Sequence, residues 1–189
     1  MRVVFLGTPD FSVPFLQALV QHQTTLGVEL VGVITQPDRR KGRGLKTTPP
    51  PVKIAADYLK LPLFQCESVR SNCYAFEFLK ETRPDLIITV AFGQILPREF
   101  FAHPPLGSLN VHTSLLPQYR GAAPVVHAIL NGEKETGVSI MKLDEKMDSG
   151  EVVAQVSTVI DQDMTAGELQ RDLSRIGIRL LWNIEGGIS

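Results

Sequence analysis

The segment that decides the fold runs from Asn110 to Pro124 and has the sequence Asn-Val-His-Thr-Ser-Leu-Leu-Pro-Gln-Tyr-Arg-Gly-Ala-Ala-Pro. At its start, Leu109 and Val111 alternate with Asn110 and His112. Side chains along a β-strand point to opposite faces with a period of two, so this alternation predicts a strand. The amide of Asn110 and the imidazole of His112 therefore share one face of it.

A short helix is predicted directly after this segment. The stretch from Val125 to Leu130 is mostly apolar, and Asn131-Gly132 is a typical helix stop. A strand, a loop and a helix in this order indicate an open α/β sheet, in which ligands bind at the carboxyl ends of the strands. Asn110 and His112 are thus candidates for chemistry, although two buried polar side chains held by backbone hydrogen bonds would produce the same pattern.

The bulk composition is that of an ordinary globular protein. Its 189 residues are 43% hydrophobic, enough for the core of one domain or two small ones. A net charge of -1 excludes a general attraction to nucleic acid or to anionic membranes, so such a partner requires a local basic patch. Cys66 and Cys73 form no C-x-x-C pair, which argues against a zinc site and a disulfide framework. With no signal peptide or membrane-spanning segment recognisable, a reducing cytoplasm is the expected location.

The chain before Asn110 alternates predicted strands with predicted helices. Asp10 is a candidate N-cap of the first helix. The turn formed by residues 7–11, Gly-Thr-Pro-Asp-Phe, lacks the three-glycine fingerprint, which argues against a tightly held dinucleotide. The alternation predicts a parallel sheet with right-handed crossovers. Strands are expected at residues 3–6, 28–35, 61–65 and 85–91, and helices at residues 13–20, 52–59 and 74–82.

Residues 38–51 form the most basic segment of the chain. They include five cations, two glycines and three prolines without hydrophobic periodicity, which predicts an exposed, mobile loop. This basic segment is either a solvated connector or a contact for a phosphate backbone. The second alternative is supported by the observation that long loops in compact domains are usually functional.

Residues 92–97 carry apolar side chains across a glycine turn. They either fill the edge of the sheet or form the floor of a pocket for a flat aromatic ligand.

Two further strands are predicted at residues 136–143 and 151–160, with an acidic loop over residues 144–150 between them. A hairpin turn explains this loop without any function. The loop can also bring a carboxylate to the imidazole of His112. A capping box formed by Thr165 and Glu168 starts a final helix, which is expected to close at residues 186–187.

The chain strongly resembles the N-terminal catalytic domain of the methionyl-tRNA formyltransferase family. The pattern Asn-x-His-x-Ser-Leu-Leu-Pro that begins at Asn110 marks the wider formyltransferase superfamily, and the basic segment narrows the resemblance to the tRNA enzymes. The resemblance implies an α/β fold, with a Rossmann-like, mostly parallel sheet and helices on both faces. It covers essentially the whole chain, and its matching segments are residues 7–11, 35–38, 42–44, 110–124 and 136–150.

The same resemblance implies one catalytic domain over residues 1–189. Members of the family continue into a C-terminal β-barrel that helps to hold tRNA, so a fragment that lacks this second domain is expected here. The implied partners are initiator methionyl-tRNA and a folate cosubstrate. A monomer without a membrane partner is expected.

The implied reaction serves translation initiation and uses no metal. A formyl group moves from 10-formyltetrahydrofolate to the α-amine of the methionine esterified to initiator tRNA. Asn110, His112 and Asp148 match the catalytic positions of the family. Asn110 donates a hydrogen bond to the oxyanion, an interaction worth roughly 3 to 4 kcal/mol in other enzymes. His112 polarises that oxygen or shuttles a proton, and Asp148 orients and stabilises the imidazolium.

The remaining substrate contacts also follow from the resemblance. Ser114 is assigned to the folate rather than to nucleophilic attack, because the acceptor amine itself attacks. The implied folate-binding residues are Phe92, Ile95, Leu96, Ser114, Leu115, Leu116, Pro117, Leu143 and Asp144. The implied tRNA-binding residues are Arg39, Arg40, Lys41, Arg43 and Lys46, with Arg43 the first candidate for a specific role. His22, His103 and His127 match no motif and are assigned to structure or surface.

Two alternative functions differ in what they predict. A different 10-formyltetrahydrofolate-dependent formyltransferase or hydrolase, acting on a small-molecule amine or on water, would share the three catalytic residues. It would have no need of so many cations on the basic segment. A non-catalytic nucleotide- or RNA-binding module would show neither transfer nor hydrolysis.

Overall fold

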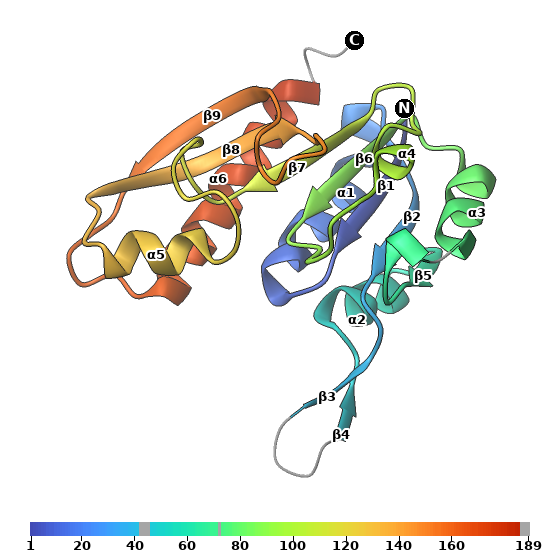
Figure 1. Ribbon diagram of the computed structural model, residues 1–189, viewed down its shortest axis with the longest axis horizontal. Helices are drawn as coiled ribbons and strands as arrows, with labels where there is room; N and C mark the ends of the chain where they lie inside the picture. Colours follow the sequence, from blue (N-terminus) through green and yellow to red (C-terminus); the bar gives the residue numbers. More distant parts are fainter. Residues whose placement is uncertain (42–45, 72, 186–189) are drawn as a thin grey trace. The chain divides into compact units, whose positions relative to one another are not determined.

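The computed structural model describes residues 1–41, 46–71 and 73–185 of the chain. The chain divides into two compact units: unit 1 spans Met1–Ser108 and unit 2 spans Leu109–Ser189. Figure 1 shows the helices and strands of each unit in chain order. No helix in the described part of the chain is long and apolar enough to cross a membrane.

Unit 1 is built on a parallel sheet. Its strands are β1 (Arg2–Gly7), β2 (Glu29–Thr35), β5 (Leu63–Gln65) and β6 (Leu86–Val90). They lie in the order β5-β2-β1-β6, and each neighbouring pair is parallel. β6 is buried along its whole length, as expected for a continuous apolar run covered on both faces. The predicted parallel arrangement of these four strands is confirmed.

Helices pack around this sheet. They are α1 (Val13–Leu26), α2 (Pro51–Tyr58), α3 (Cys73–Thr82) and α4 (Arg98–Phe101). α1 contacts α2 and β2. Phe78 of α3 stacks on Phe64 of β5 with ring centroids 5.6 Å apart, and Phe76 of α3 meets Phe100 of α4 edge-on at 5.3 Å. The first three helices confirm the predictions, whereas the one-turn α4 is too short to show helical periodicity in the sequence.

The start of α1 differs from the prediction. Asp10 lies inside a 3-10 turn, η1 (Asp10–Ser12), and Ser12 occupies the N-cap position of α1. The Ser12 hydroxyl is buried and donates a hydrogen bond to the carbonyl of Val90 at 2.6 Å. The chain is therefore tied to the end of β6 before the helix begins. The prediction of Asp10 as the N-cap is wrong, because the helix starts two residues later.

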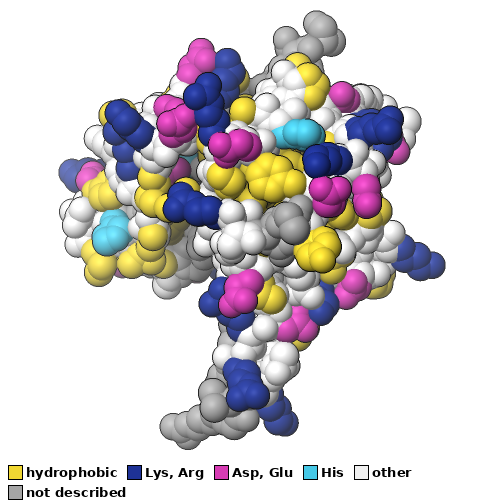
Figure 2. All heavy atoms as spheres, turned by 45° about the vertical axis from the view of Figure 1, so that its right-hand side comes forward, with side chains coloured by type: hydrophobic (Ala, Val, Ile, Leu, Met, Phe, Trp, Pro, Cys, Tyr) yellow, Lys and Arg dark blue, Asp and Glu magenta, His cyan; other side chains and the backbone are white. Residues whose placement is uncertain are grey.

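The basic segment forms a hairpin rather than an irregular loop. β3 (Arg39–Lys41) and β4 (Lys46–Thr48) pair antiparallel. Arg39, Arg40 and Lys46 are exposed, as predicted, and Figure 2 shows Lys and Arg side chains gathered along this hairpin. Short strands exposed on both faces have no hydrophobic alternation, so the sequence pattern did not reveal them. The predicted mobility of the basic segment stays a prediction, and its residues 42–45 lie outside the described residues.

Polar bonds fix the base of the hairpin. The Lys53 Nζ lies 2.9 Å from both carboxylate oxygens of Asp38, and the Gln65 Nε2 donates to Asp38 Oδ1 at 2.9 Å. The hydrogen bond from Lys53 holds the pKa of Asp38 below its ordinary value. Arg39 donates through Nη2 to the Gln36 Oε1 at 2.9 Å. These bonds therefore anchor the base of the hairpin to the rest of unit 1.

Unit 2 is built on antiparallel strands. β7 (Ser108–His112) pairs with β8 (Glu135–Lys142), and β8 pairs with β9 (Val152–Val159). α6 (Ala166–Glu185) packs against β8, β9 and α5 (Pro124–Leu130). These strands and helices confirm the predicted elements.

The capping box predicted for α6 is confirmed. The Thr165 hydroxyl donates to Glu168 Oε2 at 2.6 Å, and the Glu168 N–H donates to Thr165 Oγ1 at 3.3 Å. Hydrogen bonds from Thr165 hold the pKa of Glu168 below its ordinary value. The predicted close of the helix at residues 186–187 lies outside the described residues.

The predicted α/β fold class is confirmed. Apart from the hairpin of β3 and β4, three strand pairs within the two units are parallel and two are antiparallel. The parallel pairs belong to unit 1 and the antiparallel pairs to unit 2. The arrangement is that of a Rossmann-like, mostly parallel sheet with helices around it.

Candidate active site

Unit 2 brings together the three residues predicted to be catalytic. Asn110 and His112 lie on β7, and Asp148 lies in the loop between β8 and β9. The Asn110 Nδ2 is 3.4 Å from Asp148 Oδ1, and the His112 Nδ1 is 3.7 Å from Asp148 Oδ2. The side chains of His112 and Asp148 are only 7% and 13% exposed. The predicted approach of a carboxylate to the imidazole is confirmed.

The backbone around Asp148 turns its carboxylate toward β7. Asp148 has a φ of +47°, in the left-handed region that few residues other than glycine adopt. The N–H of Gly121 donates to Asp148 Oδ2 at 2.8 Å, and the φ of +87° at Gly121 suits a residue without a Cβ. A Cβ at Gly150 would collide with the carbonyl of Lys142. The loop that carries Asp148 therefore closes tightly onto the end of β8.

Ser139 on β8 organises the loop that follows β7. Its hydroxyl is fully buried and donates to the carbonyl of Ser114 at 2.6 Å. It accepts from the Leu116 N–H at 3.1 Å and from the Gln155 Nε2 at 2.7 Å. The same Gln155 nitrogen donates to the Leu116 carbonyl at 3.1 Å. Two side chains from neighbouring strands thus satisfy the backbone of the loop, as buried polar groups require.

The second ring nitrogen of His112 also has a partner. His112 Nε2 lies 2.9 Å from the carbonyl oxygen of Tyr119. A carbonyl oxygen only accepts hydrogen bonds, so this contact is a hydrogen bond when Nε2 carries a proton. The Tyr119 hydroxyl donates to Glu133 Oε1 at 2.5 Å and accepts from Asn131 Nδ2 at 2.9 Å. The hydrogen bond to Glu133 raises the pKa of Tyr119 above its ordinary value.

The cluster has the parts of a group-transfer site without a nucleophilic side chain. Asn110 offers a hydrogen-bond donor, His112 offers ring nitrogens that can accept and release a proton, and Asp148 offers a carboxylate beside the ring. The nearby Ser114 is 1% exposed, and its hydroxyl donates to the Gln118 carbonyl at 2.6 Å. Its oxygen is therefore a structural group. Such an arrangement suits a reaction in which the substrate supplies the nucleophile, while the protein handles an oxyanion and a proton.

The residues predicted to bind folate fall in both units. In unit 1, Phe92 and Leu96 are buried and Ile95 is 59% exposed. The Phe92 carbonyl accepts a hydrogen bond from the Thr8 hydroxyl at 2.9 Å. In unit 2, the buried members are Ser114 and Leu116, the half-buried ones Leu115 and Leu143, and the exposed ones Pro117 and Asp144. Their contact with folate stays a prediction.

The residues predicted to bind tRNA lie on the hairpin of unit 1. Arg39, Arg40 and Lys46 are exposed there, whereas Arg43 and the side chain of Lys41 lie outside the described residues. Two of the histidines assigned to structure or surface, His103 and His127, are exposed, and His22 is half-buried.

Sequence reasoning missed three residues that support the cluster. Tyr119 contributes its backbone carbonyl, which every residue type has, so no side-chain pattern could reveal it. Ser139 gave one signal, because it is a hydroxyl residue directly between the apolar residues Val138 and Ile140 of β8. A hydroxyl buried at such a position needs a partner. The partner Gln155 lies on the next strand, β9, opposite Ser139, and that pairing is a property of strand register.

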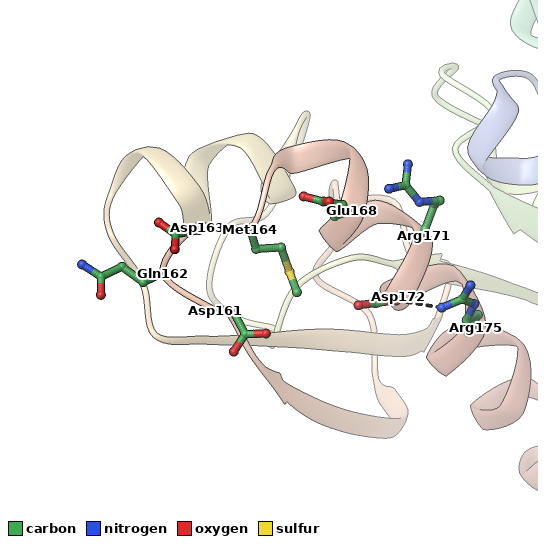
Figure 3. Close-up of a pocket in the computed structure, with 8 residues that line it drawn as sticks. All are labelled: Asp161, Gln162, Asp163, Met164, Glu168, Arg171, Asp172 and Arg175. Atoms are coloured by element: carbon green, nitrogen blue, oxygen red, sulfur yellow. Dashed lines mark hydrogen bonds and ion pairs between the residues drawn. The ribbon is translucent and has the colours of Figure 1, made fainter.

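A separate hollow lies at the start of α6 and contains none of the predicted site residues. Its volume is about 470 Å³. Figure 3 shows its charged side chains, including the pair between Asp172 and Arg175 at 3.1 Å. Its lining residues are Asp161, Gln162, Asp163, Met164, Glu168, Arg171, Asp172 and Arg175. Among the described residues, no group of three or more His, Cys, Asp or Glu side chains is arranged to hold a metal ion.

Comparison with known proteins places these features in context. The formyl transferase family matches residues 1–183 of the chain. A methionyl-tRNA formyltransferase from Natranaerobius thermophilus is 45% identical over 181 residues, which cover 96% of this chain and 56% of that protein. One from Kosmotoga olearia is 49% identical over 181 residues, which cover 96% of this chain and 57% of that protein. The chain thus spans a little over half the length of these relatives.

A solved structure supports the fold independently. The phosphoribosylglycinamide formyltransferase from Bacillus halodurans matches with a TM-score of 0.82, covering 100% of this chain and 95% of that chain. The sequence identity is 22%, so this likeness concerns the fold alone.

The role of Ser139 leads to a prediction about stability. In Ser139→Ala, the Ser114 carbonyl and the Leu116 N–H lose a buried partner, so the free energy of unfolding should fall by about 1–3 kcal/mol. Equilibrium unfolding in urea measures this change. Ser157→Ala, at an exposed position of β9, is the matched control and should stay within about 0.5 kcal/mol. Equal losses in the two variants would contradict the role of Ser139.

Proposed function

Because this chain belongs to the formyl transferase family, we propose that it transfers a formyl group from 10-formyltetrahydrofolate to the α-amine of methionine on initiator tRNA. The observation that carries the proposal is the cluster of Asn110, His112 and Asp148 in unit 2. The choice of acceptor is supported by relatives at 45% and 49% identity that are named methionyl-tRNA formyltransferases.

Each residue of the cluster has a task in this reaction. The folate supplies the formyl carbon, which the acceptor amine attacks. The Asn110 amide donates to the formyl oxygen as it gains negative charge, and a preorganised donor of this kind is worth roughly 3 to 4 kcal/mol. His112 takes the proton that the amine loses and delivers it to the folate nitrogen from which the formyl group departs. Asp148 stabilises the ring while it is positively charged.

The hairpin of unit 1 supports a tRNA acceptor. Its described cations, Arg39, Arg40 and Lys46, are exposed on a projecting element with an anchored base. Exposed arginines and lysines bind phosphates by releasing counterions, and this attraction does not require a net positive protein. A small-molecule acceptor has no use for such an element. The hairpin therefore favours the tRNA acceptor over an amine metabolite or water.

Formyl transfer by the chain tests this proposal directly. At high concentration with 10-formyltetrahydrofolate, the chain should convert methionyl initiator tRNA to its N-formyl form, measured by acid gel electrophoresis of the aminoacyl-tRNA. Release of formate at the same rate with and without tRNA would instead identify a hydrolase. No transfer at any chain concentration would refute the proposal.

The imidazole should matter to the chemical step and little to binding. His112→Ala should lower kcat by about 100-fold or more, because it removes the proton carrier, while the Kd for folate measured by calorimetry stays within about twofold. His127→Ala, at an exposed histidine of α5, is the matched control and should behave like the unchanged chain. Full activity in His112→Ala would rule out the mechanism.

The cations of the hairpin should act on tRNA binding alone. Arg40→Ala should raise KM for the tRNA and leave KM for folate unchanged, and the affinity for tRNA should fall less steeply with salt because one phosphate contact is lost. The same change should appear in Arg43→Ala. Arg179→Ala, at an exposed arginine of α6, provides the comparison and should leave both constants unchanged. Equal effects on folate and tRNA would exclude the hairpin as a tRNA contact.

A further inference from the structure

The two nitrogens of His112 face different environments. Nε2 is 2.9 Å from the Tyr119 carbonyl, which can only accept, while Nδ1 is 3.7 Å from Asp148 Oδ2. The ring is 7% exposed, so water offers few alternative partners. Both neighbouring oxygens accept hydrogen bonds, and the shorter contact, to the Tyr119 carbonyl, favours the proton of the neutral ring on Nε2. Nδ1 then carries the free lone pair of that ring.

The carbonyl of Tyr119 is held in an uncommon conformation. The φ of Tyr119 is +54°, a left-handed value that a bulky residue seldom adopts and that persists only where the surroundings enforce it. On one side, the carbonyl of the preceding residue, Gln118, accepts from the Ser114 hydroxyl at 2.6 Å. This bond secures the incoming chain but not the tyrosine itself.

The side chain of Tyr119 supplies the other restraint. Its hydroxyl donates to Glu133 at 2.5 Å and accepts from Asn131 at 2.9 Å, and both partners lie in the connection between α5 and β8. The hydrogen bond to Glu133 raises the pKa of Tyr119, so the hydroxyl remains a donor at neutral pH. Tyr119, Asn131 and Glu133 together are called the tyrosine clamp. The clamp joins the loop after β7 to a separate part of unit 2.

From these contacts we infer that Tyr119 is a positioning residue that fixes the tautomer of His112, with the tyrosine clamp holding its carbonyl against Nε2. The catalytic meaning of this inference rests on the proposed formyl transfer, whereas the tautomer itself does not. If the carbonyl moves away, the neutral ring can place its proton on Nδ1, where it faces Asp148. A ring in that tautomer has no free acceptor at Nδ1 to take the proton of the amine.

The inference is tested by removing one hydroxyl. Tyr119→Phe keeps the aromatic ring but loses both clamp bonds. In nitrogen-15 NMR spectra of the full chain at a pH where His112 is neutral, the unchanged chain should show one widely separated pair of ring signals, typical of a single tautomer. In Tyr119→Phe the two signals should move toward each other, as they do in a mixture of tautomers. Tyr58→Phe, at an exposed tyrosine of α2, is the matched control and should leave the spectrum unchanged.

Kinetics provide the second measurement. Tyr119→Phe should lower kcat about tenfold, in the range of a lost hydrogen bond, with KM for folate and tRNA unchanged. Glu133→Gln keeps an acceptor for the hydroxyl and should retain most of the activity, whereas Glu133→Ala should reproduce Tyr119→Phe. Glu133 is exposed, so its substitution tests the clamp even if the change at Tyr119 impairs folding.

The outcomes separate this inference from the proposed function. An unchanged tautomer in both Tyr119→Phe and Glu133→Ala would overturn the inference, whatever happens to kcat. The NMR measurement needs neither folate nor tRNA. A shifted tautomer in a chain that cannot transfer formyl groups would therefore support the clamp and refute the proposed reaction.

Discussion

The hydrogen bond from the Gly121 N–H to Asp148 Oδ2 is the interaction on which the candidate site depends. It joins the loop after β7 to the loop between β8 and β9. At 2.8 Å it is the shortest contact that the described structure gives the Asp148 carboxylate. Both partners have positive φ values, which glycine adopts readily but an aspartate seldom does, so the loop that carries Asp148 adopts an unfavourable local conformation to make this bond. The strand pairing of unit 2 offsets the free-energy cost of that conformation, because β7, β8 and β9 hold the strand ends from which the two loops extend.

The sequence was sufficient to predict the strands and helices that bury an apolar face. The runs that became β1, β2 and β6, and the helical spacing of α1 and α2, all express burial, and burial leaves a periodic pattern. Elements without a buried face left no such pattern. The β3 and β4 hairpin is such an element. α4 buries Phe100 and Phe101, but as a single turn it is too short to show a helical period. The misplaced helix start has a similar cause, because the Ser12 hydroxyl binds a carbonyl on β6 that is distant in sequence.

The candidate site likewise contains side chains that the sequence could predict and backbone groups that it could not. Asn110 and His112 could be predicted because a period-two pattern put both on one face of a strand. The acidic loop between two predicted strands indicated a carboxylate near the imidazole, and the family resemblance identified it as Asp148. Their neighbourhood was confirmed by the geometry. The groups that set the geometry of the cluster could not be predicted, since two of them, the Tyr119 carbonyl and the Gly121 N–H, are backbone atoms. Such atoms are positioned by φ values and loop closure, which sequence patterns describe poorly.

Contact lengths differ between the groups that support the candidate site and the groups proposed to act in it. The supporting bonds are short: 2.6 Å from Ser114 to Gln118, 2.6 Å from Ser139 to Ser114, and 2.8 Å from Gly121 to Asp148. The contacts among Asn110, His112 and Asp148 are long, at 3.4 and 3.7 Å. A donor engaged at 2.8 Å would have to give up a full hydrogen bond before meeting a substrate oxygen, which would offset the gain. At 3.4 Å the Asn110 amide makes only a weak hydrogen bond, so it loses little free energy on turning to a substrate oxygen. The short bonds therefore hold the cluster in place, while the long contacts leave the Asn110 amide and the Nδ1 of His112 available to a substrate.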